Sequence, residues 1–297
     1  MPNLKSIRKR IGSVKSTQKI TRAMKMVAGA RLNRAQHRIT SMRPYAVTTG
    51  RVLREVVLAN TAQGAEEHPL LAARPEKRAL YIVITSDRGL CGSFNSSINK
   101  RAEALWKESQ ATDTQVQFAV IGRKGRDYLR RRSAPVWHVF DGLWDKLGPS
   151  SARAVAHQIL RPFLRGEIDA IYLVYNEFKS AITQRVVVEP LLPLQNWLRS
   201  EAAAGAEMGS GDFIFEPDRT SLLERLVPMY IEVTLLRALY ESMASELGAR
   251  MTAMDAATKN AKEVIGSLTL KYNRARQAAI TTEILEIIGG AEALEQG

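Results

Sequence analysis

The segment from Leu222 to Gly290 constrains this chain most, because its pattern predicts one helix that is far too long for a compact domain. Between Met229 and Ile288 the segment has no proline and only two isolated glycines, each of which costs about 1 kcal/mol in a helix. At 1.5 Å per residue, about sixty helical residues make a rod of roughly 90 Å. The chain is therefore expected to be organised around this rod.

Apolar residues recur along the rod in steps of three and four, with one four-four stutter at Met251. So narrow a stripe is typical of a coiled-coil seam rather than of the broad apolar face of a globular helix. The rod therefore needs a partner helix. The predicted seam consists of Leu226, Met229, Val233, Leu236, Tyr240, Met243, Leu247, Met251, Met254, Ala257, Ala261, Val264, Leu268, Tyr272, Ala275 and Ala279.

The N-terminal segment supplies a partner with the same stepping. Pro44 is expected to kink this helix, because proline removes a hydrogen-bond donor and collides with the preceding turn. Burial of the two stripes alone leaves the direction of their pairing open. The predicted N-terminal seam consists of Leu4, Ile7, Ile11, Val14, Gln18, Thr21, Met24, Ala28, Leu32, Ala35, Ile39 and Met42.

The positive charge of the chain is concentrated in this N-terminal helix. Residues 1–60 hold fourteen Lys or Arg against a single acid, Glu55, so they account for the whole net charge of +13. A helix with one sign of charge favours a negative partner, which is either nucleic acid or an acidic protein surface. No aromatic residue precedes Tyr45 to stack on single-stranded bases, and the seam already occupies the most basic stretch, so an acidic protein partner is favoured.

The middle of the chain alternates short apolar strands with helical spacing, which predicts an α/β layer with a mostly parallel sheet. A last strand is expected to return as an antiparallel edge. A helix is predicted over 150–164 with Ser150 or Ser151 as its N-cap, after helices at 97–109 and around Tyr128. The predicted strands are residues 79–85, 116–121, 135–140, 170–175 and 183–189.

No catalytic constellation stands out in this domain. The turn Ser86–Gly92 follows the first strand, where α/β folds often bind ligands, but it matches neither a phosphate-binding nor a dinucleotide-binding motif, and a tight turn explains it better. Cys91 has no histidine in a recognisable arrangement with it, so a buried structural thiol is predicted. We expect no catalytic residue, no cofactor and no metal site, since the histidines lack metal-ligand spacing.

Four further segments occur in order along the chain: Ser16–Ala28 (STQKITRAMKMVA), Ser41–Tyr45 (SMRPY), the turn Ser86–Gly92 (SDRGLCG) and Ile280–Ala293 (ITTEILEIIGGAEA). Together they resemble the γ subunit family of F-type ATP synthases along essentially the whole chain. In this family the terminal helices form an antiparallel coiled coil inside a ring of α and β subunits, and the α/β domain lies beside the ε subunit and the c-ring. The resemblance therefore implies α/β plus a long antiparallel coiled coil as the fold class.

The resemblance further implies a non-catalytic rotor that couples ion-driven rotation of the c-ring to conformational cycling of the β subunits, in a complex that also contains a δ subunit. The alternative is a basic coiled-coil protein that binds nucleic acid. By residue-to-residue match, contacts with β subunits are expected at Met24, Lys25, Glu246, Arg250, Arg276, Gln277 and Thr281. The shaft tip is expected to comprise Ile284, Leu285, Ile287 and Ile288.

The expected domain organisation follows from these elements. No stretch approaches eighteen consecutive apolar residues, so no membrane span is expected, nor is a secretory signal. The resemblance places the chain at the cytoplasmic face of a bacterial plasma membrane, as a peripheral subunit. The single cysteine predicts that the thiol switch of plant-type members is absent. The predicted divisions are 1–60 (shaft helix), 61–78 (connector), 79–199 (α/β domain), 200–217 (connector) and 218–297 (shaft helix and tail).

Overall fold

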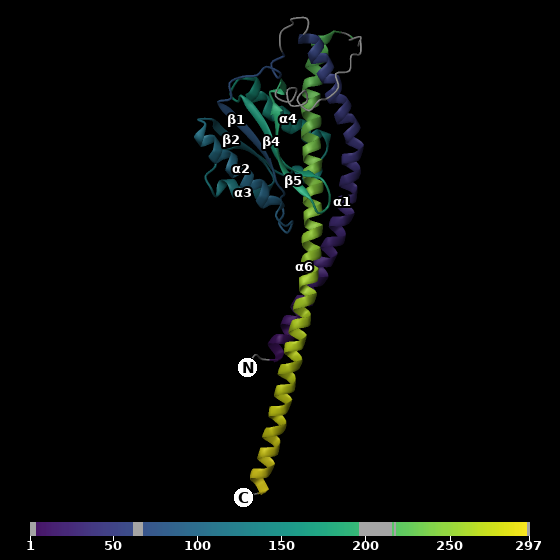
Figure 1. The fold of residues 1–297 in the computed structure, drawn as a ribbon, viewed down its shortest axis with the longest axis vertical. Coiled ribbons are helices and arrows are strands. Elements are labelled where there is room, and N and C mark those ends of the chain that lie inside the picture. The colour runs from purple at the N-terminus through teal and green to yellow at the C-terminus, as the bar shows by residue number, and fades with distance from the viewer. Residues whose placement is uncertain (1–3, 62–67, 196–215, 217, 296–297) are drawn as a thin grey trace. The chain divides into compact units, whose positions relative to one another are not determined.

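The computed structural model describes residues 4–61, 68–195, 216 and 218–295. The chain forms two compact units, one of residues 1–28 with 251–297 and one of residues 29–250. The predicted domain boundaries stay a prediction, and the predicted connector at 200–217 lies outside the described residues apart from residue 216. The elements are α1 (Leu4–Thr61), β1 (Arg78–Ile84), α2 (Phe94–Ala111), β2 (Gln115–Ile121), α3 (Arg123–Arg130), β3 (Val136–Phe140), the 3-10 helix η1 (Leu143–Lys146), α4 (Pro149–Leu164), β4 (Ala170–Phe178), β5 (Gln184–Leu192) and α6 (Arg219–Glu295) (Figure 1).

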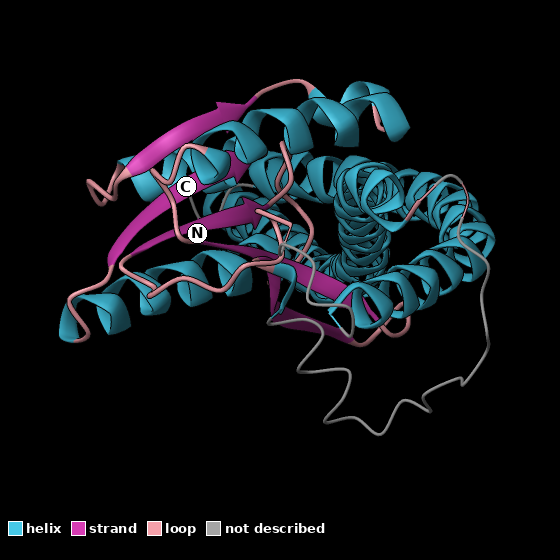
Figure 2. Ribbon diagram, turned by 90° about the horizontal axis from the view of Figure 1, so that it is seen from above, coloured by secondary structure: helices cyan, strands magenta, loops and turns pink. Residues whose placement is uncertain are grey.

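The α/β layer of the residue 29–250 unit is a five-stranded sheet in the order β3-β2-β1-β4-β5. Three neighbouring pairs are parallel, and β5 returns antiparallel to β4 at the edge. Helices cover both faces (Figure 2), which is why the strands are almost continuously apolar. The predicted fold class is confirmed. The predicted N-cap of α4 is wrong: Gly148 is the N-cap, because Pro149 has the backbone angle that suits the first helical position.

The two terminal helices pair antiparallel in the residue 1–28 and 251–297 unit. Thr21 contacts Thr258 and Lys25 contacts Asp255, so residue numbers fall along α6 as they rise along α1. Every predicted N-terminal seam position up to Ala28 is buried or half-buried, as the stripe predicted. Counting away from the Thr21–Thr258 contact, the seam recurs at identical intervals on both helices: Gln18, Val14, Ile11, Ile7 and Leu4 on α1, and Ala261, Ile265, Leu268, Tyr272 and Ala275 on α6.

Two predicted seam positions on α6 are wrong. Val264 is 42% exposed and Ala279 is exposed, whereas Ile265 is half-buried. The step after Ala261 is four residues rather than three, because the facing step on α1, from Gln18 to Val14, is also four residues long. Ala279 lies beyond Ala275, the last position of α6 with a counterpart in the described part of α1.

In the residue 29–250 unit, α6 is buried almost all round, so the predicted narrow stripe is wrong there. From Tyr230 to Ala249 nearly every side chain is buried or half-buried, and Ala249 belongs to the core between the sheet and α2. On another side, α1 packs against α6 through Arg38, which lies over the ring of Tyr240, and Tyr45, which contacts Met229. A helix between two partners is apolar on several faces. α1 itself continues through Pro44 to Thr61.

A buried polar cluster joins α6 to the sheet. The Arg237 guanidinium of α6 pairs with Glu189 of β5 and also lies 3.6 Å from Glu241. The Tyr175 hydroxyl of β4 donates to Glu189 at 2.7 Å. Burial raises the pKa of Glu241 above its ordinary value, despite the opposing charge of Arg237, and its Oε2 atom has no hydrogen-bond partner among the described residues. Burial therefore makes the ionised form of Glu241 energetically unfavourable in the folded state.

Replacing Glu241 with glutamine is expected to stabilise the chain by about 1 kcal/mol at neutral pH. The folded state binds the Glu241 proton more tightly than the unfolded state does. The free energy of unfolding of the wild type should therefore fall as the pH rises from about 4.5, the ordinary pKa of this carboxyl group, through its raised pKa in the folded state. The variant should lose this slope, measured by urea unfolding of the full chain at a series of pH values. Glu232→Gln, which removes an ion pair with the exposed Arg153 side chain, should keep the slope of stability against pH. An unchanged slope in Glu241→Gln would contradict the raised pKa of Glu241.

Candidate functional site

The turn Ser86–Gly92 at the end of β1 is filled by the chain itself. The Ser86 amide donates to Asn95 Oδ1 at 3.0 Å, and the Asn95 amide donates to Ser86 Oγ at 2.9 Å and to Cys91 Sγ at 3.2 Å. Asp87 accepts a hydrogen bond from the Arg123 amide at 2.9 Å, at the start of α3. The carboxylate thus occupies the place where an α/β fold would bind an anionic ligand. These contacts support the tight-turn interpretation.

Cys91 is buried, as the sequence predicted. Burial raises the pKa of its thiol, and the nearby charge of Glu246 acts in the same direction. A thiol that resists deprotonation is a poor nucleophile. The residue therefore has the properties of a packing thiol in the core beneath the turn.

The structure brings the predicted contact residues Glu246 and Arg250 together on α6 and joins them to this turn. The Arg250 guanidinium pairs with Glu246 and donates to the Gly89 carbonyl at 2.8 Å. Both side chains are only 14% exposed. Ser245 donates to the Asn176 carbonyl at 3.0 Å, so α6 covers the ends of β1 and β4, where a ligand would otherwise enter.

Met24 and Lys25 lie on α1 at the edge of the seam. Met24 is half-buried, and the Lys25 ammonium lies 2.6 Å from Asp255 of α6 while its side chain remains 44% exposed. The hydrogen bond from Lys25, followed by that from Lys259, lowers the pKa of Asp255. Both predicted residues are therefore partly engaged within the chain and partly open to a partner.

Arg276, Gln277 and Thr281 lie on the part of α6 that follows the last seam position, and all three are exposed. Thr281 donates to the Gln277 carbonyl at 3.0 Å, within the helix. Along the sequence of α6, Arg276 follows Arg250 by 26 residues. The predicted tip residues Ile284, Leu285, Ile287 and Ile288 are 50%, 63%, 67% and 55% exposed.

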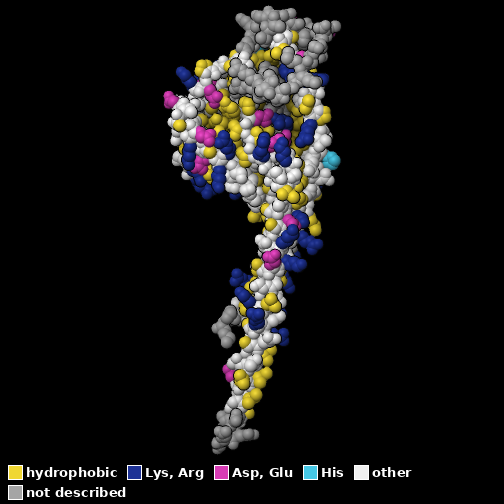
Figure 3. All heavy atoms as spheres, in the orientation of Figure 1, with side chains coloured by type: hydrophobic (Ala, Val, Ile, Leu, Met, Phe, Trp, Pro, Cys, Tyr) yellow, Lys and Arg dark blue, Asp and Glu magenta, His cyan; other side chains and the backbone are white. Residues whose placement is uncertain are grey.

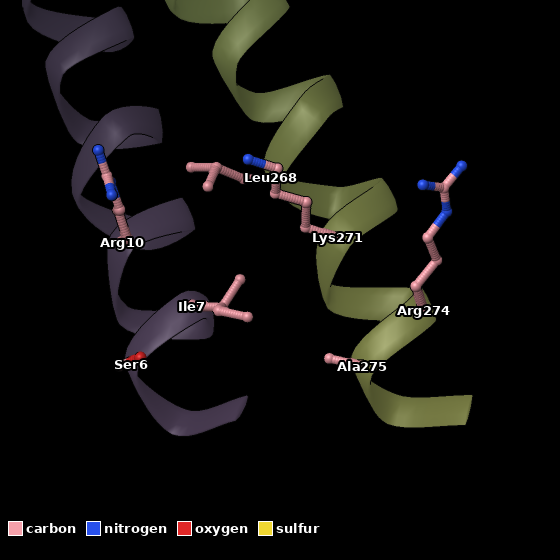
Figure 4. Close-up of a pocket in the computed structure, with 7 residues that line it drawn as sticks. All are labelled: Ser6, Ile7, Arg10, Leu268, Lys271, Arg274 and Ala275. Carbon is pink, nitrogen blue, oxygen red and sulfur yellow. The ribbon is translucent and has the colours of Figure 1, made fainter. Parts of the chain in front are cut away.

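A groove between the two helices carries a basic rim that the sequence analysis missed. It has a volume of about 720 Å³ and is lined by Ser6, Ile7 and Arg10 of α1 and by Leu268, Lys271, Arg274 and Ala275 of α6. Ile7 and Leu268 point toward the space between the helices (Figure 4). None of the three cations forms an ion pair within the described residues. The signal was available, because Lys271 and Arg274 are three residues apart and flank the seam position Tyr272.

The charged side chains on the visible face of this helix pair are mostly basic. Figure 3 shows Lys and Arg on the paired helices of the residue 1–28 and 251–297 unit, with few acids among them. An apolar groove with a cationic rim fits an acidic polypeptide segment that also offers an apolar side chain.

Residues 3–294 match the family described as ATP synthase. The ATP synthase gamma chain of Sorangium cellulosum (strain So ce56) is 60% identical over 323 aligned positions that cover 100% of both chains. The ATP synthase gamma chain of Anaeromyxobacter sp. (strain Fw109-5) is 49% identical, with 99% of this chain and 100% of the relative covered.

Solved structures with a similar fold are ATP synthase chains. The fold resembles a chain in the Tetrahymena thermophila mitochondrial ATP synthase central stalk and c-ring, with a TM-score of 0.60 and 28% identity, covering 80% of this chain and 99% of that one. A chain of the Euglena gracilis mitochondrial ATP synthase rotor has a TM-score of 0.63, with 93% and 98% covered, and at 17% identity it shows the fold alone.

Proposed function

Because the chain belongs to the ATP synthase gamma chain family, we propose that it is the rotor of an F-type ATP synthase, a non-catalytic central-stalk subunit. Rotation of a c-ring by ion flow turns the chain inside a ring of α and β subunits. The angle of its asymmetric surface then sets the nucleotide affinity of each β subunit in sequence. Such control requires the shaft to contact the conformational states of the β subunits differently.

The observation that carries this proposal is the uninterrupted helix α6, 77 residues from Arg219 to Glu295. Its first part is buried in the α/β unit, its middle is paired with α1, and its end is exposed and apolar. An enzyme or a DNA-binding domain has no need of an exposed, unpaired apolar helix end. An apolar sleeve in a partner is the environment that would cover Ile284, Leu285, Ile287 and Ile288.

Partner contacts are proposed along the exposed surface of the helix pair. Arg276, Gln277 and Thr281 are exposed and can meet a β-subunit loop, and the groove rim of Arg10, Lys271 and Arg274 offers a second contact for acidic side chains. Met24, Lys25, Glu246 and Arg250 stay predicted contacts through the parts of their side chains that the chain leaves exposed. Exposed ion pairs are worth only about 0 to 1 kcal/mol each, which suits a part that must move from one contact to the next.

The remaining partners and the location belong to the same proposal. We propose that the α/β unit lies beside an ε subunit and the c-ring in a complex that also holds a δ subunit, at the cytoplasmic face of a bacterial membrane. The described residues contain no helix long and apolar enough to cross a bilayer. Binding of nucleic acid, the alternative function, has no support among the relatives, which are ATP synthase gamma chains.

Reconstitution with α and β subunits tests the proposal. The isolated chain should hydrolyse no ATP, and it should form a complex with α and β subunits. Reversing the three groove cations (Arg10→Glu, Lys271→Glu and Arg274→Glu) should weaken its binding to the ring by about tenfold or more at low salt and by less at high salt. We would measure the dissociation constant at two ionic strengths.

The matched control reverses three exposed cations of the α/β unit, Lys100, Arg130 and Arg131. This variant has the same net charge and should bind the ring as the wild type does. ATP turnover by the isolated chain, or copurification with nucleic acid in place of α and β subunits, would refute the proposed function. Equal weakening in both triple variants would refute the groove as a contact.

A further inference from the structure

Lys25 has a partner within the chain that the sequence did not indicate. Its ammonium lies 2.6 Å from Asp255 Oδ1 across the helix pair, and the other carboxylate oxygen of Asp255 accepts from Lys259 at 3.0 Å. Both oxygens of Asp255 are thus occupied by cations. Asp255 is 32% exposed at its side chain, so water screens the pair only in part.

A hydroxyl pair lies one turn away in the same seam. Thr21 Oγ1 and Thr258 Oγ1 are 2.8 Å apart, and Thr21 is 8% exposed. Each hydroxyl also lies within hydrogen-bond distance of a carbonyl of its own helix, Thr21 of Gln18 at 3.1 Å and Thr258 of Met254 at 2.7 Å. The ion pair and the hydroxyl pair together make one polar step in a seam that is otherwise largely apolar.

The charges along α6 favour this alignment over its neighbours. Asp255 is the sole acid between Met251 and Lys262. An alignment displaced toward the C-terminus of α6 by one or two turns would set Lys25 against Lys259 or Lys262 and replace attraction with repulsion. The polar step therefore specifies which residues face each other.

We propose that Lys25 is a positioning residue, which together with Asp255 and the Thr21–Thr258 hydroxyl pair clamps the N-terminal part of α1 onto α6 and fixes the point at which α6 emerges from the pair. From the clamp, the matched seam steps run to Leu4 on α1 and Ala275 on α6. The next residue on α6 is Arg276, the first of the exposed contact residues. The clamp thus sets how Arg276, Gln277 and Thr281 are presented.

The role of the clamp in presenting the contact residues rests on the proposed rotor function, but the contact between α1 and α6 can be measured in the chain alone. In a Cys91→Ala chain, cysteines at two facing seam positions, Gln18→Cys and Ala261→Cys, report the closeness of the helices by their rate of disulfide formation. Lys25→Asp and Asp255→Lys should each slow this reaction by about twofold to fivefold, because like charges then face each other. The double swap K25D/D255K should restore the wild-type rate.

The same variants, assembled with α and β subunits and the membrane sector, give the functional readout. Ion transport per ATP hydrolysed should fall in both single variants and recover in the double swap, since the exchanged charges still attract each other. If Lys25 acted by binding an acidic partner, the swap would place an acid against that partner and transport would stay low, which would overturn the proposal. So would equal disulfide rates in K25D and wild type.

Lys19→Asp is the matched control, because Lys19 is an exposed cation on the same helix with no ion pair to α6 within the described residues. It should leave the disulfide rate unchanged. A slowing equal to that of K25D would assign the effect to the general field of α1 and refute the clamp. If the disulfide results hold while no variant alters transport, the role of the clamp in presenting Arg276, Gln277 and Thr281 is overturned; a wild-type chain that supports no transport would refute the rotor function instead.

Discussion

Substituting alanine for Gly122 is expected to lower the free energy of unfolding by about 3 to 5 kcal/mol, through backbone strain and overpacking. Gly122 has φ +96°, and a Cβ atom there would lie 2.2 Å from the Thr85 carbonyl oxygen, a backbone atom that has little room to retreat. Thr85 also accepts the Gly125 amide at 2.8 Å through its hydroxyl. Displacing Thr85 therefore disturbs the junction between β1 and the start of α3.

Urea unfolding of the full chain, followed by tryptophan fluorescence, measures this loss. Trp144 donates to the Thr85 carbonyl at 2.9 Å, so its emission reports the affected site. Gly142→Ala is the matched control: Gly142 also has a positive φ, of +70°, but nothing lies within 4 Å of its Cβ position. It should cost only about 1 kcal/mol. Equal losses in both variants would show that backbone conformation alone, and not the close approach to Thr85, is responsible.

Arg237→Ala is the second substitution with a large expected effect. Removing this guanidinium leaves Glu189 and the largely buried Glu241 without their cation, and breaking a buried pair from one side costs about 3 to 5 kcal/mol. The Tyr175 hydroxyl, 3.4 Å from the same guanidinium, also loses a neighbour. Because these groups join α6 to β4 and β5, the loss should detach the helix from the sheet edge.

Proteolysis and urea unfolding of the full chain would both register that loss, with the unfolding midpoint lowered and cleavage near β5 accelerated. Arg153→Ala provides the comparison, since Arg153 pairs with Glu232 but is 63% exposed; it should cost at most about 1 kcal/mol. A midpoint for Arg237→Ala within the range of the Arg153 variant would mean that the cluster adds nothing to stability.

The long helices and the positions of the strands along the chain were predictable because they depend on local pattern. An α6 of this length follows from the absence of proline between Met229 and Ile288, and the strands follow from short β-branched runs. Cys91 was predictable as a buried thiol because no base accompanies it. These features are encoded within a few residues of each other.

Features that depend on a second segment were not predictable in the same way. The choice of Ile265 over Val264 is made by the spacing of α1, and both residues are equally apolar. Burial of α6 on several sides between Tyr230 and Ala249 requires knowing that α1 and the sheet both pack there. The pairings of Lys25 with Asp255 and of Arg250 with Gly89 join residues far apart in the chain, which sequence spacing cannot reveal.

The emergence of α6 from its pairing with α1 has a mechanical consequence. Up to Ala275 a load on α6 is shared by two packed helices, whereas from Arg276 onward no described residue of α1 faces it. A single helix twists and bends more than a helix pair under the same load. Elastic energy therefore collects in the last turns of α6, which can act as a spring that smooths the delivery of each step to the surrounding subunits.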